Sequence, residues 1–418
     1  MKSSKWWLAF TMVGALGASP ATLGHPDPEP AAAEPSASRE PSFEEALRGG
    51  KPMLAVRLRI EDVEQDNLLE DANALTLRGR LGYQTAEWHG LSGLLEFEVV
   101  EAFGGEAYNS GPPPNGNGKV TRSVIPDPEG EEVNQWYLQY NARELSNTRF
   151  RLGRQRLILD NARHVGNVGW RQNEQTYDAF AIQSKAIPHL EYQYAFLNQL
   201  NDIFFRNIEM DGHLVNLALV LPDTTHRLVA YGYFLDFEPV TMTDHRTLGL
   251  RGSGDFDLSS LKLGYVLEYA RQDDYKEAPS TVDADYRLIE LSVAGGPFKT
   301  WAGLETLGGD GTYAFGTPLA TLHAFNGWAD QFLATPVNGL EDRYAGISVK
   351  PVSNATLQLI YHDFVSDSGS IDYGSEWNAA IGFTPAPGWS LLAKLADYSA
   401  DALSVDTRKL WLQMEFSF

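Results

Sequence analysis

The chain has 418 residues and a formal net charge of −22, with 43% hydrophobic and 11% aromatic residues. Such acidity argues against unaided nucleic-acid binding, and the apolar content is too high for a disordered acidic chain. There are no cysteines, which excludes disulfides, cysteine-ligated zinc, iron–sulfur clusters and thiol nucleophiles. We expect no cofactor.

Residues 1–24 have the pattern of a secretory signal peptide. Lys2 and Lys5 precede an apolar run over residues 6–18, and small residues follow at 19–21. An uncleaved anchor is the alternative, but the run is shorter than the ~20 apolar residues of a membrane helix. Residues 25–50 are predicted to be a disordered spacer rich in Pro, Ala and Glu. Within it, Ser42 to Glu45 can cap a short helix that Gly49 and Gly50 would end.

Residues 51–418 are predicted to form an all-β domain, because segments of about ten residues alternate apolar with polar or small positions. In the first segment Leu54, Val56, Leu58 and Ile60 share one face, and two arginines lie on the other. The expected strands are near 54–60, 75–84, 92–101, 135–141, 148–155, 177–184, 190–197, 213–221, 226–236, 246–253, 261–271, 285–294, 298–307, 341–350, 356–364, 376–384, 389–398 and 410–418. Bacterial outer-membrane barrels have an even number of antiparallel strands, as this count of about 18 does.

The connections favour a transmembrane antiparallel β-barrel over a soluble sandwich, because short and long ones alternate. Short turns are predicted at 185–189, 222–225, 295–297, 351–354 and 385–388, and long loops at 102–134, 156–176, 272–284 and 308–340. Outer-membrane barrels have short periplasmic turns and longer extracellular loops, so both termini are expected in the periplasm. The mean hydropathy of −0.28 fits such a barrel, since only one strand face meets lipid and the other would line a wet lumen.

The last strand alternates from Leu410 to the terminal Phe418, which resembles the signature that outer-membrane barrels present to their assembly machinery. Aromatic residues near strand ends are expected to form interfacial girdles, with core aromatics of a soluble sheet as the alternative: Trp136, Trp301, Tyr361, Trp377, Trp389 and Phe418. We therefore expect a bacterial outer-membrane location, with lipid and lipopolysaccharide as surroundings.

Strand parity places clustered cations on the inward faces: Arg57, Arg59, Arg78, Arg80, Arg149, Arg151, Arg251 and Lys394. Arginine pairs bidentately with carboxylates, so a row of arginines would pass an anionic solute between weak sites. The alternative is that they brace the wall by pairing with inward carboxylates such as Glu96, Glu98, Glu191, Glu268 and Glu415. We leave both readings open.

Other candidate sites in the sequence are weaker. The acidic runs at 273–285 and 367–376 lack calcium-loop spacing and are read as solvated loop charge. His164, His323 and His362 are read as loop or girdle residues, because no hydrolase motif accompanies them. The Gly- and Pro-rich loop from Gly104 to Gly130 is expected either to constrict the lumen or to be a mobile surface loop.

Two blocks resemble the alginate-export family of outer-membrane barrels: residues 151–156 with 168–179, and residues 325–340. The start from Phe43 to Lys51, continuing to Arg59, resembles the same family. The resemblance covers residue 43 to the end and implies a monomeric 18-stranded barrel with a positively charged conduit for polyuronate. It adds three conduit residues near the loop after the fifth strand: Arg154, Arg156 and Arg171.

Exporters of this family have a long periplasmic turn late in the barrel that plugs the lumen, whereas the matching turn here is only residues 385–388. The resemblance therefore favours a porin-like member. Our interpretation is a non-enzymatic outer-membrane channel for anionic, uronate-type saccharides or other small anions. The alternatives are secretion of alginate polymer, a non-specific porin and a barrel-type hydrolase.

Overall fold

The computed structural model describes residues 40–145, 147–238 and 243–418. The predicted signal peptide (residues 1–24) and most of the predicted spacer lie outside the described residues. In the described part, the short helix α1 (Phe43–Arg48) is capped at its N-terminus by Ser42. The Ser42 hydroxyl accepts a hydrogen bond from the Glu45 backbone N–H, and the Glu45 carboxylate accepts one from the Ser42 N–H. No helix among the described residues is long and apolar enough to cross a membrane.

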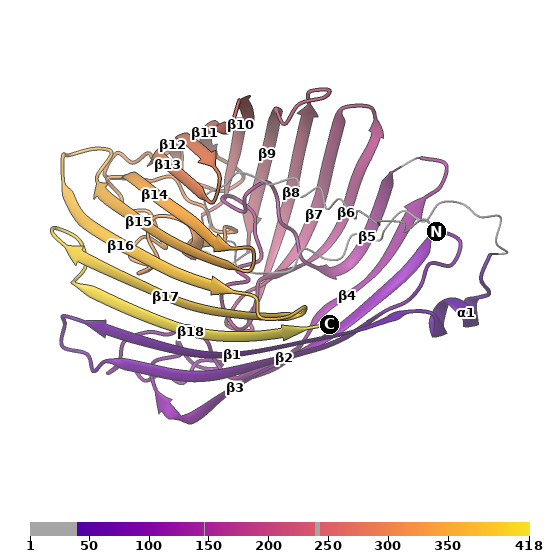
Figure 1. Cartoon of the computed structure of the whole chain (residues 1–418), viewed down its shortest axis with the longest axis horizontal. Helices are drawn as coiled ribbons and strands as arrows, with labels where there is room; N and C mark the ends of the chain where they lie inside the picture. Colours follow the sequence, from indigo (N-terminus) through magenta and orange to yellow (C-terminus); the bar gives the residue numbers. More distant parts are fainter. Residues whose placement is uncertain (1–39, 146, 239–242) are drawn as a thin grey trace, which may run out of the picture.

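The described residues form one closed antiparallel sheet of eighteen strands (Figure 1). Each strand pairs with the next in the chain, and β1 also pairs with β18, which closes the barrel. The strands are β1 (Lys51–Gln65), β2 (Ala72–Gln84), β3 (Leu91–Ala107), β4 (Gly130–Ala142), β5 (Thr148–Gln155), β6 (Thr176–Ile187), β7 (Leu190–Asn201), β8 (Asn207–Val220), β9 (Arg227–Phe237), β10 (His245–Leu258), β11 (Leu261–Asp274), β12 (Asp283–Gly295), β13 (Phe298–Leu307), β14 (Leu340–Val352), β15 (Ala355–Val365), β16 (Asp372–Phe383), β17 (Trp389–Ala400) and β18 (Thr407–Ser417).

The predicted all-β barrel and its strand positions are confirmed, and the connections are less regular than predicted. The turns at one end are short, such as 188–189, 259–260 and 353–354. At the other end three loops are long: β3–β4 (108–129), β5–β6 (156–175) and β13–β14 (308–339). However, the connections 66–71, 202–206, 366–371 and 401–406 at that end are as short as turns. A closed barrel can carry a few long loops, because strand pairing alone holds the remaining hairpins together.

The outward face of the barrel is apolar. Alternating residues along neighbouring strands expose large hydrophobic side chains, for example Leu250 on β10, Leu267 on β11 and Ile289 on β12. Trp389 and Phe418 are exposed at strand ends, as a girdle requires, whereas Trp136 and Trp377 are exposed in the middle of β4 and β16. Trp301 was expected among them, and that expectation is wrong: it is buried at 5% exposure on the inward face of β13.

The hydrophobic core lies inside the barrel, between the wall and the long loops. Phe315, Leu319 and Trp328 of loop β13–β14 pack in one cluster with inward strand residues such as Tyr286 and Trp411. The expectation of a wet lumen is therefore wrong along this part of the wall. The alternating pattern shows which side chains point inward, but not that loops distant in the sequence cover them.

Candidate functional site

Loop β5–β6 folds into the lumen. Six consecutive residues of this loop, 170–175, are each at most 4% exposed, although five of them have polar or charged side chains. Buried polar groups of this kind must be paired. The partners come from the barrel wall and from loop β13–β14, and they define the candidate site.

The two long loops pair with each other inside the barrel. Val165 and Leu319 form a parallel bridge, and the Gly166 N–H donates to the Leu319 carbonyl at 2.8 Å. The Thr321 N–H donates to the Ala162 carbonyl at 3.0 Å. Thr321 precedes the short 3₁₀ helix η1 (Leu322–Ala324), which presents His323 to the same interior. The loops thus form one internal structure that narrows the lumen.

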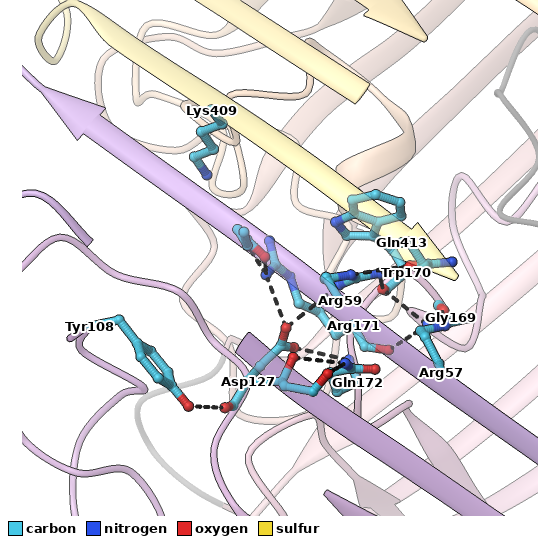
Figure 2. Close-up of polar contacts among 12 residues, drawn as sticks. Arg57, Arg59, Tyr108, Asp127, Gly169, Trp170, Arg171, Gln172, Lys409 and Gln413 are labelled. Atoms are coloured by element: carbon cyan, nitrogen blue, oxygen red, sulfur yellow. Dashed lines mark hydrogen bonds and ion pairs between the residues drawn. The ribbon is translucent and has the colours of Figure 1, made fainter. Parts of the chain in front are cut away.

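Two arginines on β1 hold the backbone of loop β5–β6 (Figure 2). Arg57 Nη1 donates to the carbonyls of Gly169 at 3.0 Å and Arg171 at 3.1 Å. Arg59 Nη2 donates to the Trp170 carbonyl, and its guanidinium carbon lies 4.2 Å from the centroid of the Trp170 ring. These loop carbonyls lie outside helices and strands, and side chains of the barrel wall provide their hydrogen-bond donors.

The arginines around this contact are paired with inward carboxylates. Arg57 and Arg78 are opposite each other in the sheet, and each contacts Glu415 at 2.9 Å. Arg80 pairs with Glu98 and, at 3.1 Å, with Glu174. Arg156 contacts Glu174 at 2.5 Å and Glu96 at 2.9 Å. The bracing interpretation is therefore confirmed for these residues. We call Arg57, Arg59, Arg78, Arg80, Arg156 and Arg171 the arginine cluster.

Asp330 of loop β13–β14 joins the arginine cluster to η1. It accepts hydrogen bonds from Arg171 Nη2 at 3.2 Å and Lys409 Nζ at 2.8 Å, and its other oxygen lies 2.6 Å from His323 Nδ1. Burial alone would raise the pKa of Asp330, but His323, Lys409 and Arg171 hold it well below its usual value. Burial lowers the pKa of His323 well below its usual value, against the attraction of Asp330. The structure thus favours an ionised Asp330 beside a neutral His323.

The sequence did not single out Asp127, Trp170 or Asp330. Asp127, at the end of loop β3–β4, accepts the Gln172 N–H at 2.9 Å and lies 3.5 Å from Arg59. Its carbonyl accepts from the Tyr108 hydroxyl at 3.0 Å (Figure 2). The end of this loop therefore reaches the lumen, which agrees with the expectation that the Gly- and Pro-rich loop constricts it. The sequence does carry a signal for this site, because five consecutive polar or charged residues, 171–175, follow Trp170.

The other predicted lumen residues lie apart from the arginine cluster. Arg251 pairs with Glu268 on the adjacent β11. Arg151 donates to Gln139 Oε1 at 2.8 Å and stacks on Tyr137, and Arg149 shares its strand face. Arg154 pairs with Asp178 at 2.8 Å. It lies two positions after the exposed Leu152 and opposite the exposed Trp136, so strand parity does not support its assignment to the conduit.

Lys394 on β17 lies in a cage of aromatic rings. Its Nζ is 3.8 Å from the Trp328 centroid, 4.2 Å from that of Trp170 and 2.6 Å from His323 Nε2. It therefore touches both long loops at once. His164 and His323 lie in loops β5–β6 and β13–β14, which agrees with the expectation of loop residues, whereas His362 is buried on β15 and is neither a loop nor a girdle residue. No group of three or more His, Asp or Glu among the described residues is placed to hold a metal ion.

Some donors of the arginine cluster remain unused. Within the described part of the chain, Arg78 Nε and Nη1 and Arg80 Nη2 are buried and make no hydrogen bond. Buried guanidinium N–H groups without an acceptor are costly. They are the positions in the lumen at which an anionic oxygen would be bound most readily.

A closed antiparallel barrel of eighteen strands, with an apolar outer face and a lumen narrowed by inward-folded loops, defines the fold class: it is the fold of outer-membrane porins. No family model matches the chain, and no curated protein matches it.

Solved structures do match the chain. It is similar to Pseudomonas aeruginosa OpdK crystallised with vanillate, at 14% identity and a TM-score of 0.68 over 89% of this chain and 99% of that one. It is similar to OccK9 (OpdG) of the same organism, at 12% identity and 0.70 over 89% and 100%. Acinetobacter baumannii OccAB4 matches at 12% identity and 0.69 over 88% and 98%. These likenesses establish the fold.

Proposed function

We propose that the protein is an outer-membrane channel through which small anionic solutes diffuse. The observation that carries this proposal is the unused, buried N–H donors of Arg78 and Arg80 in the narrowed lumen. Arginine clusters that retain free donors bind carboxylates transiently, which allows entry and release. The similarity to a channel crystallised with vanillate, a small carboxylate, supports the same class of solute.

Within this class we favour uronate-type saccharides, on the resemblance of residues 168–179 and 325–340 to the alginate-export family. Passage of a polymer is disfavoured because loops β5–β6 and β13–β14 occupy the lumen and pair with each other. Most of the residues that carry the resemblance, 168–179 and 325–340, lie in these two loops. Small uronate oligomers are therefore the proposed substrates, and alginate secretion is not.

We also infer how the barrel sits in the membrane. The short-turn end, which carries α1 and both ends of the sheet, faces the periplasm, and the three long loops start from the outside. The strand ending at Phe418 presents its alternating apolar face to the assembly machinery, and lipid and lipopolysaccharide surround the monomer.

The test is the reversal potential of the purified protein in a planar bilayer under a salt gradient, with and without oligomannuronate. We expect anion-selective conductance that the oligosaccharide blocks. Arg78→Gln and Arg151→Gln should each lower the anion preference, since Arg151 also lies on the inward face, where it contacts the uncharged side chains of Gln139 and Tyr137.

The matched control is Arg287→Gln, which removes an exposed arginine on β12 that pairs with Asp285. It should leave the reversal potential unchanged. Equal reversal potentials in the wild type, Arg78→Gln and Arg151→Gln would refute the proposed selectivity. Conductance that is unaffected by oligomannuronate would leave anion selectivity intact but refute the uronate assignment.

A further inference from the structure

A second site lies away from the arginine cluster, where residues 324–328 of loop β13–β14 face the wall formed by β10 to β15. The space between them is partly open to solvent, and about 580 Å³ of it, open solvent included, is free of protein atoms. Its lining combines aromatic rings with carboxylates, of which Trp301, Trp328, Tyr344, Glu290, Asp342 and His362 matter here.

Two reciprocal pairs of aromatic and glycine residues shape the wall of this pocket. Trp301 on β13 is opposite Gly346 on β14, and Tyr344 on β14 is opposite Gly303 on β13. A Cβ on Gly346 would lie 2.2 Å from Trp301 Cζ2, and one on Gly303 would lie 2.2 Å from Tyr344 Cζ. Each ring therefore lies against the backbone of the neighbouring strand. Laid against the wall in this way, the rings leave room for a ligand between themselves and the loop.

The charges around the pocket are mostly neutralised by neighbours outside it. Arg251 pairs with Glu268, and Glu305 receives Arg163 Nε at 2.6 Å. Asp342 contacts His362 Nδ1 at 2.9 Å. Glu290 accepts only the neutral Tyr344 hydroxyl, at 2.8 Å, among the hydrogen bonds described. The pocket therefore has an excess of carboxylate oxygens, which disfavours an anionic ligand.

Two buried ring nitrogens of the lining have no partner. Trp301 Nε1 and His362 Nε2 make no hydrogen bond to any described residue. The indole N–H of Trp301 can only donate, so it requires an acceptor. An ammonium group provides donors alone and cannot satisfy it. A hydroxyl group both donates and accepts, so a hydroxylated ligand can satisfy Trp301 and the carboxylates together.

We propose that this pocket binds one ring of a neutral saccharide. The C–H face of the ring packs on Trp301 and Tyr344, and its hydroxyls donate to Glu290 and Asp342 and accept from Trp301 Nε1. The site is distinct from the arginine cluster in both place and charge preference. The saccharide proposal does not rest on the anion selectivity of the channel. Saccharide binding is measured by titration and anion selectivity by the reversal potential, so either can fail without the other.

The experiment is calorimetric titration of the purified, folded barrel with D-glucose, D-galactose and D-mannose, beside D-glucuronate and D-glucosamine. We expect at least one neutral hexose to bind, and to bind at least about tenfold more tightly than glucuronate, a difference of ~1.4 kcal/mol. Absence of binding by all three neutral hexoses would overturn the proposal. Glucosamine that binds more tightly than every neutral hexose would overturn it in favour of a cation site.

Two variants locate the binding in this pocket. Trp301→Phe keeps an aromatic ring and removes the unpaired N–H, and Glu290→Gln keeps an acceptor for the Tyr344 hydroxyl and removes the charge. Each should weaken hexose binding about tenfold, the size expected when a partner of a buried hydrogen bond is lost. Trp377→Phe, which changes an exposed tryptophan on the outer face, is the matched control and should bind as the wild type does. Wild-type affinity in both pocket variants would overturn the assignment, provided that heat-modifiable gel mobility shows folded barrels.

Discussion

The guanidinium of Arg59 lies 4.2 Å above the ring of Trp170 while its Nη2 donates to the carbonyl of the same residue. One side chain of β1 thus holds both the ring and the backbone of a residue that lies 111 positions further along the chain. Arg59 also donates to Gln413 Oε1 on β18 and lies 3.5 Å from Asp127. The strand that closes the barrel is therefore also the strand that fixes the lumen loop.

Replacement of Arg59 should destabilise the folded barrel. Arg59→Met removes the cation nearest to the buried Asp127 carboxylate and leaves Arg171, at 3.8 Å, as its one cationic partner among the described residues. Removing one partner of a buried ion pair typically costs about 3–5 kcal/mol. The free energy of unfolding in guanidinium chloride measures this loss. Arg408→Met, which breaks exposed rim pairs with Glu64 and Asp397, is the control and should cost less than about 1 kcal/mol. Equal losses in the two variants would contradict the anchoring role.

The attachment of the loops should weaken in acid. The pKa of His323 is lowered in the folded loop, so the released loop binds more protons, and the stabilising contribution is lost as pH falls below about 6.5. The pKa of Asp330 is also lowered, and that contribution is present above about pH 4 and lost below it. We expect channel current fluctuations to increase as pH falls from 7 to 4.

His323→Gln removes the titrating ring and serves as the control for this pH dependence. The groups that face His323 are Asp330, Lys394 and, more distantly, Arg171. In the variant, the change between pH 6.5 and 5 should disappear and the change near pH 4 should remain. Fluctuations that do not vary with pH in the wild type would refute the prediction.

The glycine opposite Trp301 should not tolerate a side chain. Gly346→Ala places a Cβ 2.2 Å from the Trp301 ring, and overpacking of this kind typically costs about 1–3 kcal/mol. The temperature at which the barrel loses its compact gel mobility should fall. Gly382→Ala is the matched control on β16, because a Cβ there meets nothing within 4 Å. A fall of the same size in both variants would show that the loss comes from the strand backbone and not from Trp301.

The cost of a charge on the outer face should depend on depth. Ile289 on β12 is 53% exposed in the middle of a strand, and Leu258 is 59% exposed at the turn end of β10. Arginine at the bilayer midplane costs about 2–4 kcal/mol and near the interface about 0–1. Ile289→Arg should therefore lower the free energy of unfolding from lipid vesicles much more than Leu258→Arg does. Similar costs at both positions would contradict the proposed membrane position.

The sequence by itself determined the barrel. Strict alternation from Leu54 to Ile60 and from Leu410 to Phe418 assigns each residue to the inward or outward face, because the side-chain period of a strand is two. The same parity placed Arg57, Arg59, Arg78 and Arg80 inside, and it placed Glu98 and Glu415 there as candidate partners, which the ion pairs confirm. The girdle assignment of Trp301 is wrong because it rests on the position of Trp301 near a strand end. The alternation of β13 places the same residue on the inward face.

Only the tertiary structure decided what fills the lumen. Loop contacts such as Arg59 with Trp170, Arg171 with Asp330 and Lys394 with Trp328 join residues that no local pattern connects. Strand pairing is dictated by neighbours in sequence, whereas the path of a loop depends on which buried groups on distant strands need partners. The sequence therefore supplied the arginines, and the fold determined which of them hold loops and which retain free donors.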